Sequence, residues 1–79
     1  MYKIFRVKTD YKTKLEVIKY INGKRVVIKE DTFSLNNTEV VAKDEKSAKK
    51  IFQTTTLRDL GIKPKDCKIN AIEYVRDYQ

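Results

Sequence analysis

Apolar β-branched and aromatic residues are interspersed with basic residues through the first 29 positions, a composition typical of short β-strands. We expect strands over Tyr2–Lys8, Leu15–Ile21 and Lys24–Lys29. Between the last two lies the pair Asn22-Gly23, which tolerates the positive φ angles that a type I′ turn requires at both central positions. The sequence therefore predicts a β-hairpin that turns at Asn22-Gly23.

The pattern changes after residue 29. Glu30-Asp31-Thr32 is a polar break, and Phe33–Val41 is a candidate fourth strand that has a kink or turn at Asn36-Asn37. These features predict three or four strands before the first helix.

A helix is predicted from about Glu45, with the side chain of Asp44 capping its free amides. Its expected buried stripe has the spacing i, i+3, i+4 and i+7 and consists of Ala48, Ile51, Phe52 and Thr55. Three successive threonines, residues 54–56, are poor helix formers, so we expect the helix to fray there or to add one short turn before Gly61 ends it.

Pro64 opens a turn with Lys65 and Asp66, and Cys67–Val75 is the last predicted strand. Cys67, Ile69 and Ala71 are expected on one face of this strand. Apolar residues continue at Ile72 and Val75, which indicates a bulge or burial on both faces.

The elements sum to an α+β fold in one domain over residues 1–79. We expect a mostly antiparallel sheet of four or five strands in the order β-β-β-(β)-α-β, with one helix on one face. The other face of the sheet is expected to be open to a partner.

The charge of the chain is unevenly distributed. Met1–Lys29 holds nine basic and two acidic residues, whereas Glu30–Gln79 holds nine of each, so the whole net charge of +7 belongs to the first part. Because this part also has the pattern of β-structure, the charge predicts a cationic surface that attracts phosphate or an acidic protein. The residues that we expect to contact the partner are Lys3, Arg6, Lys8, Lys12, Lys14, Lys24, Arg25, Lys29, Lys63 and Lys65.

The composition argues against catalysis. There is no histidine, which excludes Ser-His-Asp and Cys-His nucleophiles and removes the commonest transition-metal ligand. The two glycines cannot form a phosphate-binding or dinucleotide-binding loop. We expect no enzymatic activity, no cofactor, no metal and no small-molecule substrate.

Cys67 is the single cysteine, and without a disulfide a reducing cytoplasm is the expected location. No apolar run approaches the ~20 residues of a membrane span, so we expect a soluble protein without a membrane partner.

Two segments resemble the archaeal ribosomal protein LX family. Lys3-Ile4-Phe5-Arg6-Val7-Lys8 is similar to the opening strand of that family. The second half is similar in the strand ending at Val40-Val41-Ala42, the helix start at Asp44-Glu45 with Ala48 after it, and the closing strand with Lys68-Ile69, Ile72, Glu73 and Val75. This resemblance implies a small basic protein bound to ribosomal RNA. The family has a Gly-Ser-basic turn where this chain has Leu57-Arg58-Asp59-Leu60, and the Asn22-Gly23 hairpin is an insertion relative to it.

The favoured function is RNA binding by charge neutralisation through the basic N-terminal sheet. The alternative is an accessory protein of a phage or mobile element that binds and inhibits a host protein through a sheet edge or its basic face. An open edge also allows a homodimer.

Overall fold

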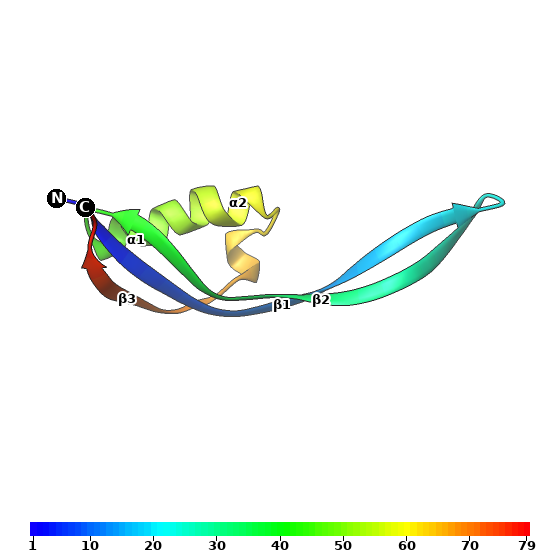
Figure 1. The fold of residues 1–79 in the computed structure, drawn as a ribbon, viewed down its shortest axis with the longest axis horizontal. Coiled ribbons are helices and arrows are strands. Elements are labelled where there is room, and N and C mark those ends of the chain that lie inside the picture. Colours follow the sequence, from blue (N-terminus) through cyan, green and yellow to red (C-terminus); the bar gives the residue numbers. More distant parts are fainter.

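The computed structural model describes all 79 residues as one three-stranded antiparallel sheet with a helical segment on one face (Figure 1). The strands are β1 (Lys3–Ile21), β2 (Lys24–Ala42) and β3 (Ile69–Asp77), arranged in the order β2-β1-β3. The structure is α+β, but the predicted four or five strands and the order β-β-β-(β)-α-β are wrong. The order along the chain is β-β-α-β.

The predicted strands are too short because polar segments inside β1 and β2 resemble the ends of strands. Residues 9–14 continue β1 without interruption, and Glu30-Asp31-Thr32 continues β2. Within residues 9–14 alternate side chains still face the core side, as shown by the cross-strand pairs Tyr11↔Leu35 and Thr13↔Phe33. A strand with one face in solvent can carry charged residues at its outward positions without ending.

β2 runs through Asn36-Asn37, where a kink or turn was expected, and the irregularity is a β-bulge in the facing strand β1. The register shifts between Lys8 and Tyr11, so that Thr9 and Asp10 lie opposite Asn36 alone. Thr9 is buried, and its hydroxyl donates a hydrogen bond to the Leu35 carbonyl across the bulge. The bulge therefore bends the ribbon without breaking the pairing of β1 and β2.

The predicted hairpin turn is confirmed. Asn22 and Gly23 have φ angles of 52° and 76°, and the neighbouring pair Ile21↔Lys24 closes the ladder. Both central residues are left-handed, as a type I′ turn requires.

The helical segment covers the half of the sheet that contains β3 (Figure 1). It comprises α1 (Glu45–Ile51), a π-helical turn η1 (Phe52–Thr56) and α2 (Leu57–Asp59). The Asp44 cap is confirmed, since its carboxylate accepts a hydrogen bond of 2.7 Å from the Ser47 amide.

The buried face of this helix differs from the predicted stripe. Ala48 and Phe52 are fully buried, but Ile51 and Thr55 are exposed, and Leu57 is the next core residue. The π-helical turn adds one residue to the spacing, so that the core position after Phe52 falls at i+5.

Gly61 ends the helix as predicted, with φ 71°. The Ile62 amide bonds the Leu57 carbonyl at 2.8 Å, and the Gly61 amide bonds the Arg58 carbonyl at 3.0 Å, which is the Schellman pattern. Ile62 and Leu57 both join the core, so the turn that ends the helix also contributes to packing.

The turn predicted at Pro64 is the 3-10 turn η2 (Pro64–Asp66), and β3 follows it. A second bulge leaves Asn70 unpaired between Thr9↔Ile69 and Lys8↔Ala71. Ala71 is therefore exposed on the face opposite Cys67 and Ile69, contrary to the prediction, and Ile72 packs against the core instead.

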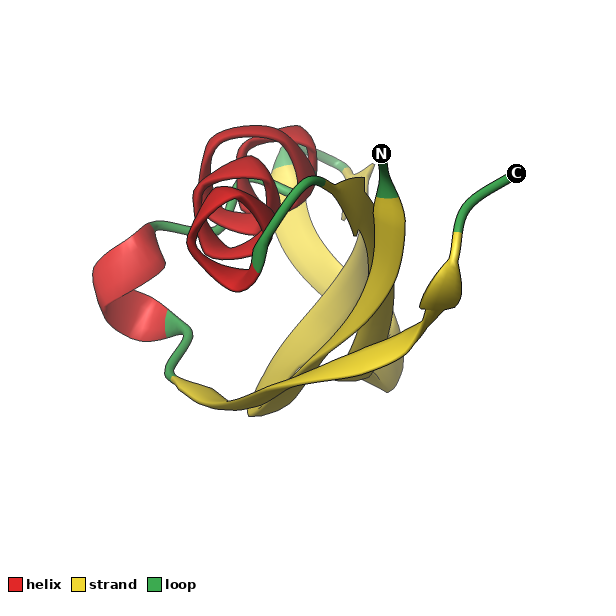
Figure 2. Ribbon diagram, turned by 90° about the vertical axis from the view of Figure 1, so that its left-hand side faces the viewer, coloured by secondary structure: helices red, strands yellow, loops and turns green.

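The β1–β2 ribbon extends well beyond β3 and the helical segment. Every residue from Lys14 to Thr32 is exposed; we call this segment the arm and the rest of the molecule the body. β3 pairs with β1 only as far as Thr9, so the arm has two strands and no helix above it (Figure 1). The molecule measures 58 × 24 × 17 Å as a result. Viewed along the sheet, all helices lie on one side of it (Figure 2).

Candidate binding surfaces

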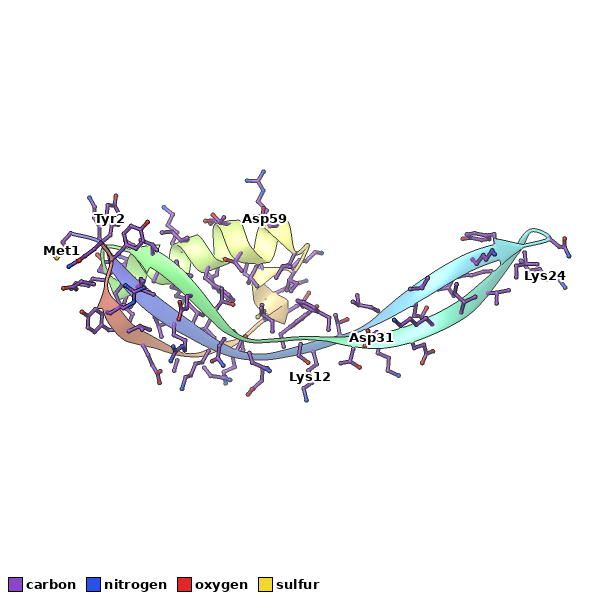
Figure 3. The ribbon with its side chains drawn as sticks, viewed as in Figure 1. Met1, Tyr2, Lys12, Lys24, Asp31 and Asp59 are labelled. Carbon is purple, nitrogen blue, oxygen red and sulfur yellow. The ribbon has the colours of Figure 1, made fainter.

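The outward face of β1 carries a row of basic side chains. Phe5, Val7 and Thr9 point into the core, so the residues between them point away from the helices. Tyr11 and Thr13 continue the inward series, and Lys12 is directed away from the helical side (Figure 3). We call the outward basic residues of β1 the basic row: Arg6, Lys8, Lys12 and Lys14.

Part of the basic row is neutralised by the neighbouring strands. Arg6 pairs with Glu39 on β2 at 3.4 Å, and Lys8 pairs with Glu73 on β3 at 3.0 Å. Arg25 on the arm likewise pairs with Glu16 at 3.0 Å. These ion pairs are exposed and contribute little to stability, so a phosphate can compete for each cation.

Lys12 and Lys14 are different, because no carboxylate lies within 4.0 Å of either ammonium group. They lie where the third strand has ended, beside an open edge of β1. The two lysines are therefore the part of the basic row that is free to bind an anion.

The ten predicted contact residues do not form one patch. Lys3 lies near the termini, with its ammonium 5.9 Å from the centre of the Tyr74 ring. Lys24 lies at the opposite end, beside the hairpin turn (Figure 3). Lys29 is on the arm, and Lys63 and Lys65 flank Pro64 at η2, on the helical side of the sheet. The predicted cationic surface is drawn out along the ribbon.

The sequence reasoning missed the apolar character of the arm. Eight large apolar side chains are exposed on it: Leu15, Val17, Ile18, Tyr20, Ile21, Val26, Val27 and Ile28. A two-stranded ribbon is marginally stable alone, and a contiguous exposed apolar surface marks an interaction site. The sequence contained this signal, because the predicted hairpin has apolar residues on both of its faces. A single small core cannot cover all of them.

The pairing register divides the arm into two faces. Leu15 pairs with Asp31 and Val17 with Lys29, whereas Ile18 pairs with Val27 across a bulge at Ile28. We call these two faces the inner face and the outer face. The inner face holds Leu15, Val17, Lys19, Ile21, Lys24, Val26, Lys29 and Asp31, and the outer face holds Glu16, Ile18, Tyr20, Arg25, Val27 and Glu30.

The inner face runs into an apolar pocket of about 280 Å³ at the root of the arm. The strands supply Leu15 and Phe33 to its lining, and the end of the helical segment supplies Leu60 and Ile62. The remaining lining residues are Tyr11, Thr13 and Gly61. The pocket has no acidic or basic lining residue, so it suits an apolar side chain.

Two groups of the body with a shifted pKa, Cys67 and Asp44, have structural explanations that do not involve catalysis. Burial raises the pKa of the Cys67 thiol, and a hydrogen bond with Thr9 only partly opposes this effect. A buried thiol with a raised pKa is a poor nucleophile. The hydrogen bond from the Ser47 amide lowers the pKa of Asp44, which is the role of a helix cap.

Comparisons with protein families, with curated proteins and with solved structures found no match. The resemblance to the LX family therefore stays a prediction. No helix of the structure is long and apolar enough to cross a membrane.

Proposed function

We propose that this protein is a non-enzymatic RNA-binding protein whose contact surface is the basic row and its continuation along the outer face of the arm. The observation that carries this proposal is the pair Lys12 and Lys14, which stand without an acidic partner on a sheet face that no helix covers. The three ion pairs remove equal numbers of cations and anions, so the net charge of +7 is not reduced by them.

The outer face of the arm supports RNA as the polyanion. Tyr20 is 70% exposed and pairs across the ribbon with Arg25. Aromatic rings and guanidinium planes are the groups on which unpaired bases stack, and unpaired bases are accessible in RNA loops and bulges. The mechanism is neutralisation of phosphates by the lysines, with Tyr20 and Arg25 contacting bases. The ribosomal setting that the LX resemblance implies, and a cytoplasmic location, belong to this proposal.

The test is the salt dependence of binding to a structured RNA and to a duplex DNA of equal length. We expect tight RNA binding in 50 mM salt, with log K falling by ~0.7 to 0.9 for each phosphate contact per decade of salt. Replacing Lys12 and Lys14 by Gln should reduce this slope by about that amount for each lysine. The matched control replaces Lys46 and Lys49 on α1 by Gln and should leave the slope nearly unchanged. No RNA binding in 50 mM salt, or equal slopes in the two variants, would contradict the proposal.

A protein partner is the second candidate, and the exposed apolar arm is the observation that favours it. An inhibitor of a host protein, encoded by a phage or mobile element, could insert such a ribbon into a groove. The tagged protein should then retain one stoichiometric protein from host lysate after nuclease treatment, and Val17→Glu should abolish that retention. If retention of all macromolecules is lost with nuclease, RNA is the partner.

A further inference from the structure

The two free lysines of the basic row lie opposite two hydroxyl groups. Lys12 pairs across the ribbon with Ser34, and Lys14 pairs with Thr32. Phe33, between the two hydroxyl residues, packs against the core side, so both of its neighbours point outward with the lysines. All four outward residues are exposed. Hydroxyl and ammonium groups both donate hydrogen bonds to phosphate oxygens, and we call this set of four residues the phosphate patch.

Carboxylates border the phosphate patch at both of its ends along the ribbon. Toward the body lies Asp10, which accepts a hydrogen bond of 2.8 Å from the uncharged side-chain amide of Asn70. Toward the hairpin turn lie Glu16 and Glu30, which face each other across the ribbon. Arg25 compensates Glu16 at 3.0 Å, but no cation lies within 4.0 Å of the Glu30 carboxylate. Each border therefore carries an uncompensated negative charge.

These borders are close enough to repel a phosphate bound beyond the patch. Side chains on one face of a strand are two residues apart, or ~6.6 Å, so each border lies about that far from the nearer lysine. This is within the ~8 Å over which charges act at physiological ionic strength. Further into the body, Arg6 and Lys8 are already paired with glutamates. A polyanion that followed the ribbon would therefore meet carboxylates at both ends of the patch.

We propose that the RNA backbone crosses the ribbon at the phosphate patch, at a steep angle to the strands. This inference rests on the proposed RNA binding and narrows its phosphate contacts to one part of the basic row. β2 is an edge strand, and β1 has no neighbour on its other side beyond Thr9, so a crossing backbone leaves the patch over open edges. On this path the outward side chains of the ribbon are two cations and two hydroxyls.

The crossing also defines the form of the RNA. Tyr20, the residue proposed to contact a base, lies six residues beyond Lys14, or ~20 Å along the ribbon. A strand that crosses at the patch does not pass Tyr20, so the two contacts need two segments of one folded RNA. A hairpin supplies both, because its stem presents phosphates to the patch and its loop presents an unpaired base to Tyr20.

The salt dependence of binding to a hairpin RNA with a uridine loop tests the crossing. Lys12→Gln combined with Lys14→Gln should lower the slope of log K against log salt by ~0.7 to 0.9 for each lysine. Arg6→Gln combined with Lys8→Gln removes the same charge from the paired part of the basic row and should lower the slope by less than half as much. Equal reductions would mean that the RNA follows the row, which overturns the crossing while RNA binding stands. No binding in about 50 mM salt would overturn both proposals.

The hydroxyl groups give a test that leaves the charge unchanged. Thr32→Val combined with Ser34→Ala should weaken hairpin binding roughly tenfold without changing the salt slope, because neutral donors release no counterions. The matched control is Thr54→Val combined with Thr55→Val, which removes exposed hydroxyls from the helical side and should leave the affinity unchanged. Equal affinities of these two variants would overturn the phosphate patch.

The form of the RNA is tested with the blunt duplex that corresponds to the stem. Tyr20→Leu should weaken binding of the hairpin about tenfold and change binding of the duplex by less than about twofold, because only the loop offers an unpaired base. Equal losses for the two RNAs would overturn the two-segment contact. All of the substituted residues except Arg6 and Lys8 are fully exposed, and circular dichroism should show the parent's fold in every variant.

Discussion

The body and the arm are built from the same two strands, yet only the body has a core. In the body, β3 and the helical segment add a third strand and a cover to the ribbon, and they enclose nine core residues that include Val7, Phe52 and Leu57. In the arm, β1 and β2 continue with comparable apolar content, but none of its side chains is buried. The difference lies in what covers the ribbon, not in the ribbon.

This comparison separates two uses of apolar residues. Those of the body are explained by the fold, because their burial stabilises it. Those of the arm are unexplained by the isolated chain, since exposed apolar side chains on a long ribbon invite aggregation unless a partner covers them. The apolar residues of the arm are therefore the part of the sequence that the fold of the isolated chain does not explain.

The largest expected effect separates the two regions by stability. Phe52→Ala removes a fully buried ring between the helix and the sheet and should lower the free energy of unfolding by about 3 to 5 kcal/mol. The same truncation on the arm, Tyr20→Ala, should change it by less than about 0.5 kcal/mol. Urea denaturation of the two variants measures both values. Similar losses would mean that the arm contributes to the core.

A smaller effect is expected at the end of the helix. Gly61→Ala should cost about 1 kcal/mol, because an L-residue is disfavoured at its φ of 71°. A Cβ there meets nothing within 4 Å, so the cost is one of backbone conformation alone. Gly61→Asn is the control, since asparagine tolerates this conformation, and thermal denaturation should show a smaller loss for it.

Local signals in the sequence were sufficient for the ends of elements. The Asn22-Gly23 turn, the Asp44 cap and the Gly61 stop depend on residues within a few positions of each other, and all three are present. The continuity of β1 and β2 depends on pairing between distant residues, which a polar segment such as Glu30-Asp31-Thr32 conceals. The π-helical turn was missed for a related reason, because only packing on the sheet makes Leu57 the residue to bury.

The composition identifies the basic residues but not how they are arranged. Charge counts found the basic residues, but the acids that pair with Arg6 and Lys8 lie on other strands. Both arginines among the expected contacts, Arg6 and Arg25, have carboxylate partners, whereas Lys12 and Lys14 do not. The alternation of side chains along a strand places these two lysines on one face, provided that the strand is continuous there. The continuity of β1 is what the sequence did not reveal.

A pH-dependent effect belongs to the body alone. The pKa of Asp44 is lowered in the folded protein by the hydrogen bond from the Ser47 amide. A carboxyl group whose pKa is lower in the folded state stabilises it above the pKa of the unfolded state, and this contribution is lost as the pH falls through the lower, folded value. Asp44→Asn keeps a side-chain acceptor for the Ser47 amide and removes the titration. The free energy of unfolding of this variant should therefore fall less than the parent's between pH 5 and pH 2. Denaturation at several pH values in this range measures both proteins, which are expected to have similar stability at pH 5.

The smallest effect on the stability of the body is expected from the largest change to the chain, a deletion within the arm. Deleting residues 16–20 and 25–30 leaves Leu15, Ile21, Asn22, Gly23, Lys24 and Asp31, a short hairpin that keeps the turn. Every core residue lies outside the deleted segments, and a shorter ribbon loses no buried contact. Thermal denaturation should show nearly the parent's midpoint, while RNA binding is weakened through loss of Tyr20 and Arg25. Because Lys12 and Lys14 remain, part of the salt dependence should survive. If the body unfolds without its arm, the whole ribbon is one cooperative unit. The boundary at Lys14 then divides exposed from buried residues, but it does not divide two regions of independent stability.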